Sequence, residues 1–263
     1  MLIIKIGGGK DLNLVGIVKD LASLNEKFII VHGANALRDE LAQKLGIEKK
    51  VVTSLSGFDS VFSDENTIDL AMMAYAGLKN KRIVELFQQH GVNAVGLSGI
   101  DGKVIQGKRN SGIKVREGGK TLLLRDFSGK PKAINKQLLD LLLDNGYTPV
   151  LSVPLIDENN FAINSDNDDI IALLQKEFKA EKIISLIEAP GFLLDKNDPS
   201  SLVSNISKAE LEEMEQKVEG RMKRKILALR KLFESGDTTV ILSDGRTENP
   251  IKDALDGKGT TIQ

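Results

Sequence analysis

Short β-rich runs alternate with helical patterns along this chain, and this alternation is the feature that most restricts its fold. The apolar runs 2–6 and 27–32 have the length of strands, and helical periodicity follows each of them. Consecutive parallel strands need a crossover connection, which is usually a helix that packs on the sheet. The sequence therefore predicts an α/β fold, a three-layer α/β/α sandwich with a mainly parallel, open sheet.

Further strands and helices are expected in the same alternating order. The other predicted strands are 92–97, 148–153, 182–186, 239–242 and 259–262. The predicted helices are 12–24, 36–45, 64–90 with a break or kink near Gly77, 135–144, 166–178, 208–215, 223–234 and 251–255. Between 101 and 127 alternating residues are punctuated by glycines, which predicts β-hairpins above the main sheet. A seam near Lys179 divides the chain into lobes 1–178 and 179–263.

The composition excludes several classes of function. The 263 residues include no cysteine, which excludes disulfides, thiolate metal sites and cysteine nucleophiles. His32 and His90 are the only histidines, so metal ligation by histidine is not expected, and no metal-ligating residue is predicted. A formal net charge of −1 gives no overall attraction to nucleic acid or to a membrane. Neither a signal peptide nor a membrane span of ~20 apolar residues is present, and we expect a soluble cytoplasmic protein.

Glycine turns follow the first two predicted strands. Gly7, Gly8 and Gly9 come directly after the run 2–6, and Gly33 ends the run 27–32. Ligands gather at the carboxyl ends of parallel strands, where glycines let backbone N–H groups approach phosphate oxygens. Glycines at strand ends also occur for steric reasons alone. The chain has no GxxxxGK[ST] sequence, which excludes a P-loop, and no GxGxxG follows the first strand.

Two lysine-bearing segments lie next to glycines at opposite ends of the chain. Lys5 stands two residues before Gly7, and the run 220–225, Gly-Arg-Met-Lys-Arg-Lys, begins a predicted helix. Two lysines on separate phosphate-approaching turns are what a phosphoryl-transfer enzyme without a P-loop needs. Taken alone, the run 220–225 is equally well explained as the solvated basic start of a helix.

Three other features have both a structural and a functional interpretation. The segment 164–169, Asn-Ser-Asp-Asn-Asp-Asp, fits a helix N-cap with surplus carboxylates and lacks the glycine and glutamate of a calcium loop. His32 is either a structural residue at a strand end or a general base. Met72 and Met73 lie on a predicted helix and are interpreted as core or dimer contacts.

The predicted hairpin region carries a local excess of positive charge. Its basic residues are Lys103, Lys108, Arg109, Lys114, Arg116, Lys120 and Arg125. Such charges commonly serve solubility, and their alternative function is to dock an acidic partner. The lack of interleaved aromatic residues argues against single-stranded nucleic acid.

Together these motifs resemble the amino acid kinase superfamily, in its N-acetylglutamate kinase branch. The resemblance covers essentially the whole chain and rests on residues 5–8, 31–33, 95–102, 164–168, 189–191, 220–225, 244–246 and 259–260. Within the branch, the segments 220–225 and 244–251 are most similar to kinases of carrier-bound aminoadipate. The resemblance implies phosphorylation of the side-chain carboxylate of aminoadipate or glutamate, held on a small acidic amino-group carrier protein, in lysine or arginine biosynthesis.

The resemblance also implies roles for individual residues. The implied catalytic residues are Lys5, Asp168 and Lys225, with both lysines at the transferring phosphoryl group and Asp168 holding their ammonium groups. The implied phosphate and nucleotide contacts are Gly7, Gly8, Gly33, Ala34, Pro190, Gly191 and Met222. The implied acceptor side comprises Asn164, Gly57 and Val61. ATP and Mg²⁺ are the implied cofactors, and the product is an acyl phosphate.

The chain departs from the pattern of this branch at several positions. Val61 stands where an acceptor-binding arginine is expected, which removes a bidentate clamp for a carboxylate. Ala34 and Asn35 replace glycines after Gly33, Asn167 replaces a small residue before Asp168, and Ile187-Glu188 replaces the usual polar pair before Pro190-Gly191.

Three functions remain in view at this stage. The first is an ATP-dependent kinase of carrier-bound aminoadipate or glutamate, and the second a kinase of free N-acetylglutamate or another small carboxylate. The third is a catalytically weak nucleotide-binding or regulatory homologue. Hexameric, arginine-regulated members of the branch that this chain resembles interlace through a helix before the first strand. The chain starts at its first strand, so the resemblance implies a homodimer without arginine feedback, with contacts from the helical region 72–81.

Overall fold

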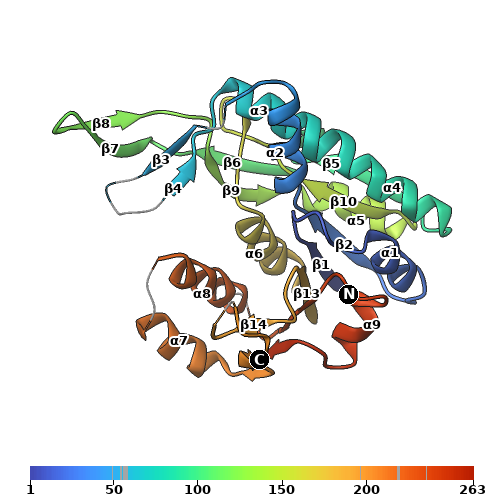
Figure 1. Ribbon diagram of the computed structural model, residues 1–263. Helices are drawn as coiled ribbons and strands as arrows, with labels where there is room; N and C mark the ends of the chain where they lie inside the picture. The colour runs from blue at the N-terminus through green and yellow to red at the C-terminus, as the bar shows by residue number, and fades with distance from the viewer. Residues whose placement is uncertain (49, 54, 56–58, 196, 218–219, 235) are drawn as a thin grey trace.

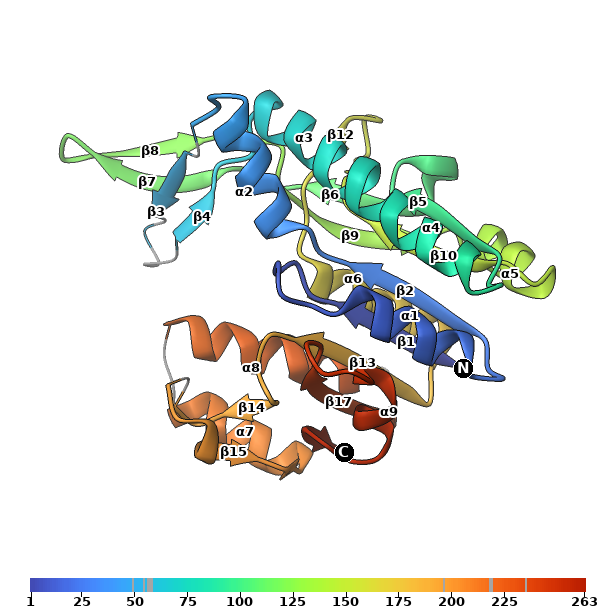
Figure 2. The same cartoon turned by 45° about the vertical axis from the view of Figure 1, so that its right-hand side comes forward.

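The computed structural model describes residues 1–48, 50–53, 55, 59–195, 197–217, 220–234 and 236–263 (Figure 1). One sheet runs through the middle of the molecule, with helices above and below it (Figure 2). Within the described residues this sheet has eight strands. Their order is β16 (Asn205–Ile206), β18 (Thr260–Ile262), β17 (Thr239–Asp244), β13 (Lys182–Ile187), β1 (Leu2–Ile6), β2 (Phe28–His32), β10 (Thr148–Ser152) and β5 (Ala94–Ser98).

The sheet is mainly parallel, and the predicted three-layer sandwich is confirmed. β1 pairs in parallel with β13 on one side and with β2 on the other. Among the described pairings of this sheet, only β17 and β18 run antiparallel. Each predicted strand of the sheet occurs within two residues of its predicted bounds, because apolar runs of four to six residues leave little freedom of assignment.

Two hydrophobic clusters cover the two faces of the sheet. On one face Ile4 and Ile6 pack with α1 (Leu14–Ala22), α4 (Asn80–Gln89) and α9 (Pro250–Leu255). On the other face Ile3 and Val31 pack with α5 (Lys136–Asp144), α6 (Asn167–Phe178), α7 (Lys208–Lys217) and α8 (Gly220–Phe233).

The alternation of side chains along β1 fixes the direction of Lys5. Successive strand residues point to opposite faces, so Lys5 lies on the same face as Ile3. That face is covered by α6, and Lys5 is the second-to-last residue of β1. The strand register therefore directs the ammonium group toward the α6 side of the sheet, at the carboxyl end of the strand.

A second, smaller sheet lies beside the carboxyl end of β10. Its strands are, in order, β12 (Ala162–Ile163), β11 (Leu155–Ile156), β6 (Ile105–Arg109) and β9 (Gly129–Ile134). β6 pairs antiparallel with β9, a strand absent from the sequence prediction because Gly129 and Pro131 disguise it. Within 101–127 only β7 (Ile113–Glu117) and β8 (Lys120–Leu124) form a hairpin. The two figures show this arm projecting from the body, beside β3 (Val51–Thr53) and β4 (Asp59–Val61).

The predicted long helix 64–90 contains a π-helical segment at its expected break. α3 (Glu65–Ala71) is followed by the π-helix Met72–Lys79, which includes Gly77, and then by α4. π-Helical turns accommodate an extra residue in a helix and bend it without ending it. The remaining elements are α2 (Asn35–Lys44), the 3₁₀ turns Asp101–Lys103 and Pro199–Ser201, β14 (Phe192–Leu193) and β15 (Leu202–Val203).

The proposed lobe boundary at 178/179 falls where α6 ends. Lys179 takes a left-handed conformation, with φ 47°, and β13 begins three residues later. The hydrogen-bonded sheet continues across this boundary through the pairing of β1 with β13. In the described part of the chain, no helix has the length and apolar character needed to cross a membrane.

Asp20 of α1 holds the first turn of α9 through hydrogen bonds, and its replacement tests this contact. Its fully buried carboxylate accepts hydrogen bonds from the backbone N–H groups of Ile251 and Lys252, each at 3.1 Å. Asp20→Ala leaves both donors of the first turn of α9 unpaired, so we expect the free energy of unfolding to fall by about 2 kcal/mol. Urea denaturation measures this loss. Asp20→Asn keeps an acceptor oxygen and should lose less; equal stability of Asp20→Ala and the native chain would contradict this role.

Candidate functional site

The two glycine turns pack directly against each other at the carboxyl ends of β1 and β2. Gly33 donates its backbone N–H to the Ile6 carbonyl at 2.8 Å. A Cβ atom on Gly33 would lie 2.8 Å from Cα of Gly8, and one on Gly8 would lie 2.7 Å from the backbone nitrogen of Asn35. Real Cβ contacts are not this short, so glycine is required at both positions. The predicted pair of glycine turns forms one compact backbone surface.

Lys5 and Asp168 form an ion pair beside these turns. The Lys5 ammonium donates a hydrogen bond to Oδ1 of Asp168, although the residues are 163 positions apart in the sequence. The Lys5 side chain is 20% exposed and that of Asp168 is 43% exposed, so the pair is shielded on one side and open on the other. Two of the three predicted catalytic residues are thus in contact at an accessible edge of the sheet.

Three consecutive residues at the start of α6 connect it to three different elements. Asp168 reaches β1 through Lys5. The Asn167 amide donates to the His32 carbonyl at 3.1 Å, and the Asp169 carboxylate accepts from Lys231 of α8 at 2.7 Å. Asp166 occupies the N-cap position, but its side chain makes no capping hydrogen bond. The polar run therefore does more than cap its helix, and the simple capping interpretation is incomplete.

α8 begins at Gly220, three residues before the predicted start at 223, and carries Lys225 and Met222 in its first turns. The side chains of these two residues lie outside the described part of the structure. Ile226, the next residue after Lys225, is fully buried in the cluster that contains Ile170 and Ile171 of α6. This packing and the Lys231–Asp169 ion pair fix α8 against α6, the helix whose first turn holds Asp168.

The three predicted acceptor residues lie in different parts of the chain, and the structure describes two of them. Asn164 bridges the small sheet: its backbone bonds Phe127 and Gly129, and its amide donates to Ser63 Oγ at 3.2 Å. Val61 ends β4 and pairs with Val51, next to the arm. Gly57 lies outside the described residues.

His32 is a structural residue rather than a general base. Its ring is fully buried, its Nδ1 lies 3.3 Å from the Gly33 carbonyl, and its Nε2 lies 3.1 Å from the Asn80 amide, which donates to it. Burial lowers the pKa of His32 to about 4, because the interior disfavours the charged ring. The ring is neutral at pH 7 and joins β2 to α4.

Comparison with known proteins decides the family. The family model described as "Amino acid kinase family" matches residues 1–244. The chain belongs to the amino acid kinase family. A [LysW]-aminoadipate kinase of Thermus thermophilus is 40% identical over 269 residues, with all of both chains covered. An acetylglutamate kinase of Methanopyrus kandleri is 30% identical over 265 residues, again with all of both chains covered.

A solved structure supports the fold of this family member. The carbamate kinase of Giardia has a TM-score of 0.65 with the chain at 16% identity, covering 99% of this chain and 97% of its own. Membership of the amino acid kinase family makes the chain a phosphotransferase, as the sequence predicted.

Glu188, one of the substituted positions, connects the segment after β13 to the first glycine turn. It follows β13 and accepts the backbone N–H of Asp11 at 2.7 Å. A Cβ on Gly9 would lie about 2 Å from the Glu188 carboxylate, so the two residues are in direct contact. Pro190 and Gly191 come next, and Gly191 packs on Thr260, whose hydroxyl accepts the Phe192 N–H at 2.7 Å.

The sequence prediction missed two contacts that shape the site of this kinase fold. The Asp169–Lys231 pair joins α6 to α8, and the Asp126 carboxylate holds the backbone N–H of Ser63 at 3.0 Å, next to Asn164. The consecutive carboxylates at 168 and 169 were the available signal for the first contact. No local pattern marks the second, since Ser63 and Asp126 are far apart in the chain.

Gly33→Ala tests the close approach of the two glycine turns. The added methyl group would overlap Gly8, and overpacking of this kind costs about 1–3 kcal/mol. If the turns bind phosphate, displacement of their backbone by the added methyl group should weaken binding of a non-hydrolysable ATP analogue about 10- to 100-fold, measured by calorimetry. Gly146→Ala is the control, because it strains a distant turn with φ +77° where no neighbour lies within 4 Å. Unchanged affinity in Gly33→Ala would remove these turns from the nucleotide site.

Proposed function

We propose that the chain transfers the γ-phosphoryl group of ATP to the side-chain carboxylate of aminoadipate or glutamate carried on the protein LysW. The observation that carries the proposal is the Lys5–Asp168 ion pair at the open edge of the sheet, beside the nested glycine turns. A cation held by a carboxylate beside a compact glycine backbone surface is suited to stabilise the charge of a phosphoryl group in transfer.

The proposed mechanism is positioning and charge stabilisation without a covalent intermediate. Lys5 and Lys225 offset negative charge as the β–γ bond opens, and Asp168 holds the Lys5 ammonium in place. The acceptor carboxylate is already deprotonated at neutral pH, so Asp168 is not required as a base. The acceptor oxygen attacks phosphorus, ADP leaves, and the product is an acyl phosphate.

The nucleotide is proposed to lie along the carboxyl ends of β1, β2 and β13. Gly7, Gly8, Gly33 and Ala34 are proposed to form the backbone surface beside the phosphates, while Pro190, Gly191 and Met222 flank the nucleoside. The N–H groups of Gly7 and Gly33 already donate to the Leu186 and Ile6 carbonyls, so these two glycines shape the turns and do not supply free donors. Among the described residues, no group of three or more acidic or histidine side chains could hold a metal by itself. The half-exposed Asp168 fits a Mg²⁺ that arrives on the phosphates, since Mg²⁺ uses few protein carboxylates beside substrate oxygens and water. Bound there, Mg²⁺ would neutralise phosphate charge.

LysW is proposed as the carrier because several relatives that match the whole chain carry names of LysW-linked kinases. The Thermus thermophilus enzyme shares 40% identity with the chain end to end. Val61 supports this choice. An apolar side chain cannot bind the α-carboxylate of the substrate as an arginine would. A free substrate loses that contact without replacement, whereas a substrate attached to LysW through its amino group is also held by the contacts of its carrier. Asn164 is the proposed contact to the acceptor.

Free N-acetylglutamate is the second candidate acceptor, favoured by 30% identity to the Methanopyrus kandleri enzyme. A weak nucleotide-binding homologue is the third candidate. Its support is Glu188, which places a carboxylate against Gly9 where phosphate is proposed to bind.

Trapping of the acyl phosphate by hydroxylamine separates these functions. Purified protein, ATP and Mg²⁺ are incubated with LysW-aminoadipate, LysW-glutamate or free N-acetylglutamate, and hydroxamate is quantified. We expect product with a LysW-bound substrate, at a kcat/KM at least tenfold above that with N-acetylglutamate. A preference for N-acetylglutamate would support the second function. ATP binding without product from any carboxylate would support the third.

We also propose that two copies associate through the helical region 72–81. Met72, Met73 and Leu78 are 36%, 43% and 45% exposed. These three side chains give the region an exposed apolar surface, which association of two copies would cover. Light scattering on the purified chain should give twice the monomer mass of 28.7 kDa. A monomer at micromolar concentration would contradict the proposed dimer.

A further inference from the structure

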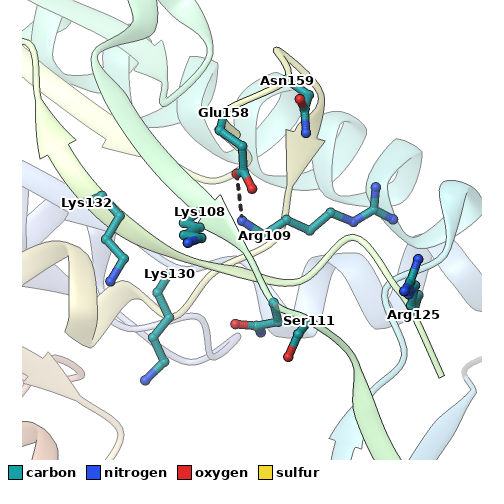
Figure 3. Close-up of a pocket in the computed structure, with 9 residues that line it drawn as sticks. Lys108, Arg109, Ser111, Arg125, Lys130, Lys132, Glu158 and Asn159 are labelled. Carbon is teal, nitrogen blue, oxygen red and sulfur yellow. Dashed lines mark hydrogen bonds between the residues drawn. The ribbon is translucent and has the colours of Figure 1, made fainter. Parts of the chain in front are cut away.

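A broad basic hollow lies on the small sheet, separate from the glycine turns. Its volume is about 680 Å³, and Figure 3 shows the side chains around it. The lining residues, which define the basic hollow, are Lys108, Arg109, Asn110, Ser111, Arg125, Lys130, Lys132, Glu158 and Asn159. Five of these side chains are cationic at neutral pH and one is anionic, so the basic hollow is a site of concentrated positive charge.

Several elements bring these cations together. Lys108 and Arg109 end β6, and Arg125 follows β8. Lys130 and Lys132 lie on β9, on either side of Pro131, where the pairing with β6 shifts register. Both side chains point in the same direction in Figure 3. The hairpin region predicted from the sequence therefore contributes only part of the basic hollow, and its two lysines on β9 come from a strand that was not predicted.

One cation is fixed and four are available. The Arg109 guanidinium lies 4.0 Å from the centre of the Phe127 ring and donates to the Asp126 carbonyl at 2.7 Å. Within the described part of the chain, no ion pair involves Lys108, Arg125, Lys130 or Lys132, and all four are exposed. Like charges held close together repel one another, and a bound anionic partner would relieve this repulsion.

The basic hollow already holds one carboxylate of the chain itself. Glu158 accepts the backbone N–H of Arg109 at 3.0 Å, drawn as a dashed line in Figure 3. This hydrogen bond, with Lys108 and Arg109 close by, lowers the pKa of Glu158 below its usual range. The basic hollow therefore already contains one carboxylate, which a backbone N–H group holds.

The basic hollow is joined to the candidate site by backbone hydrogen bonds. Gly129, next to Lys130, donates its N–H to the Asn164 carbonyl at 2.9 Å. β9 also packs against α6, whose first turn carries Asp168. A partner seated in the basic hollow would lie beside the strand that leads to the proposed acceptor contact.

We propose that the basic hollow docks an acidic segment of LysW and so delivers the tethered substrate to Asn164 and Lys5. This inference rests on the proposed function and assigns its partner a surface. A protein segment is favoured over nucleic acid, because no aromatic residue lines the basic hollow and the Phe127 ring is covered by Arg109. The width and openness of the basic hollow favour several carboxylates on one surface over a single small anion.

Paired charge reversals test the assignment. Lys130→Glu/Lys132→Glu inverts two charges in the basic hollow, and Lys114→Glu/Lys120→Glu makes the same change on the β7–β8 arm. All four lysines are exposed, so both variants should fold. The assay is acyl phosphate formation at low salt with LysW-aminoadipate and with free N-acetylated aminoadipate at high concentration.

For the variant in the basic hollow we expect KM for LysW-aminoadipate to rise roughly tenfold or more. Its kcat and its turnover of the free substrate should stay unchanged. The native KM should rise with salt, whereas that of the variant should change little. The arm variant should behave like the native chain.

An equal rise in KM for both variants, or none in either, would overturn the assignment. Binding to a mixed DNA or RNA oligonucleotide is measured as well. The assignment is also overturned if the native chain binds the oligonucleotide and the Lys130→Glu/Lys132→Glu variant does not, while KM for LysW-aminoadipate is the same in both. If the native chain forms no product from LysW-aminoadipate, the proposed function itself fails, which is a separate result visible before any variant is made.

Discussion

The contact between Lys5 and Asp168 is the interaction on which the interpretation of this molecule depends. It joins the central strand of the large sheet to the first turn of α6. Strand alternation directs Lys5 to the α6 face, and the helix dipole favours a carboxylate at the first turn. Neither residue needs an unusual backbone conformation. Their meeting follows from a parallel sheet whose carboxyl ends and helix N-termini lie at one edge.

The rest of the site is organised around the same helix end. Asp169 holds α8 through Lys231, and Asn167 holds the end of β2, so the first turn of α6 is bonded to both lobes proposed for the chain. Further out, β9 packs on α6 and carries the lysines of the basic hollow, which places the proposed carrier surface and phosphoryl site on one framework.

Local patterns predicted most of the sheet and helices, because apolar runs, caps and glycine stops are signals within a few residues. They also identified the two glycine turns, and the family resemblance singled out Lys5 and Asp168. They could not predict β9, since Gly129 and Pro131 interrupt its strand pattern. For the same reason β6 was expected to belong to a hairpin within 101–127, whereas it pairs with β9. The Asp169–Lys231 pair and the contact of Glu188 with Gly9 depend on distant segments meeting in space, which no short window of sequence contains.

A double-mutant cycle on Lys5 and Asp168 tests the central claim most directly. The kcat for acyl phosphate formation is measured for Lys5→Met, Asp168→Asn and the double variant, with Tm as the check on folding. If the two residues act as one unit, each single change should lower kcat by about 10²–10³-fold, and the double variant should fall little further. A double variant whose loss equals the product of the single losses would contradict the account, as would a nearly active Asp168→Asn.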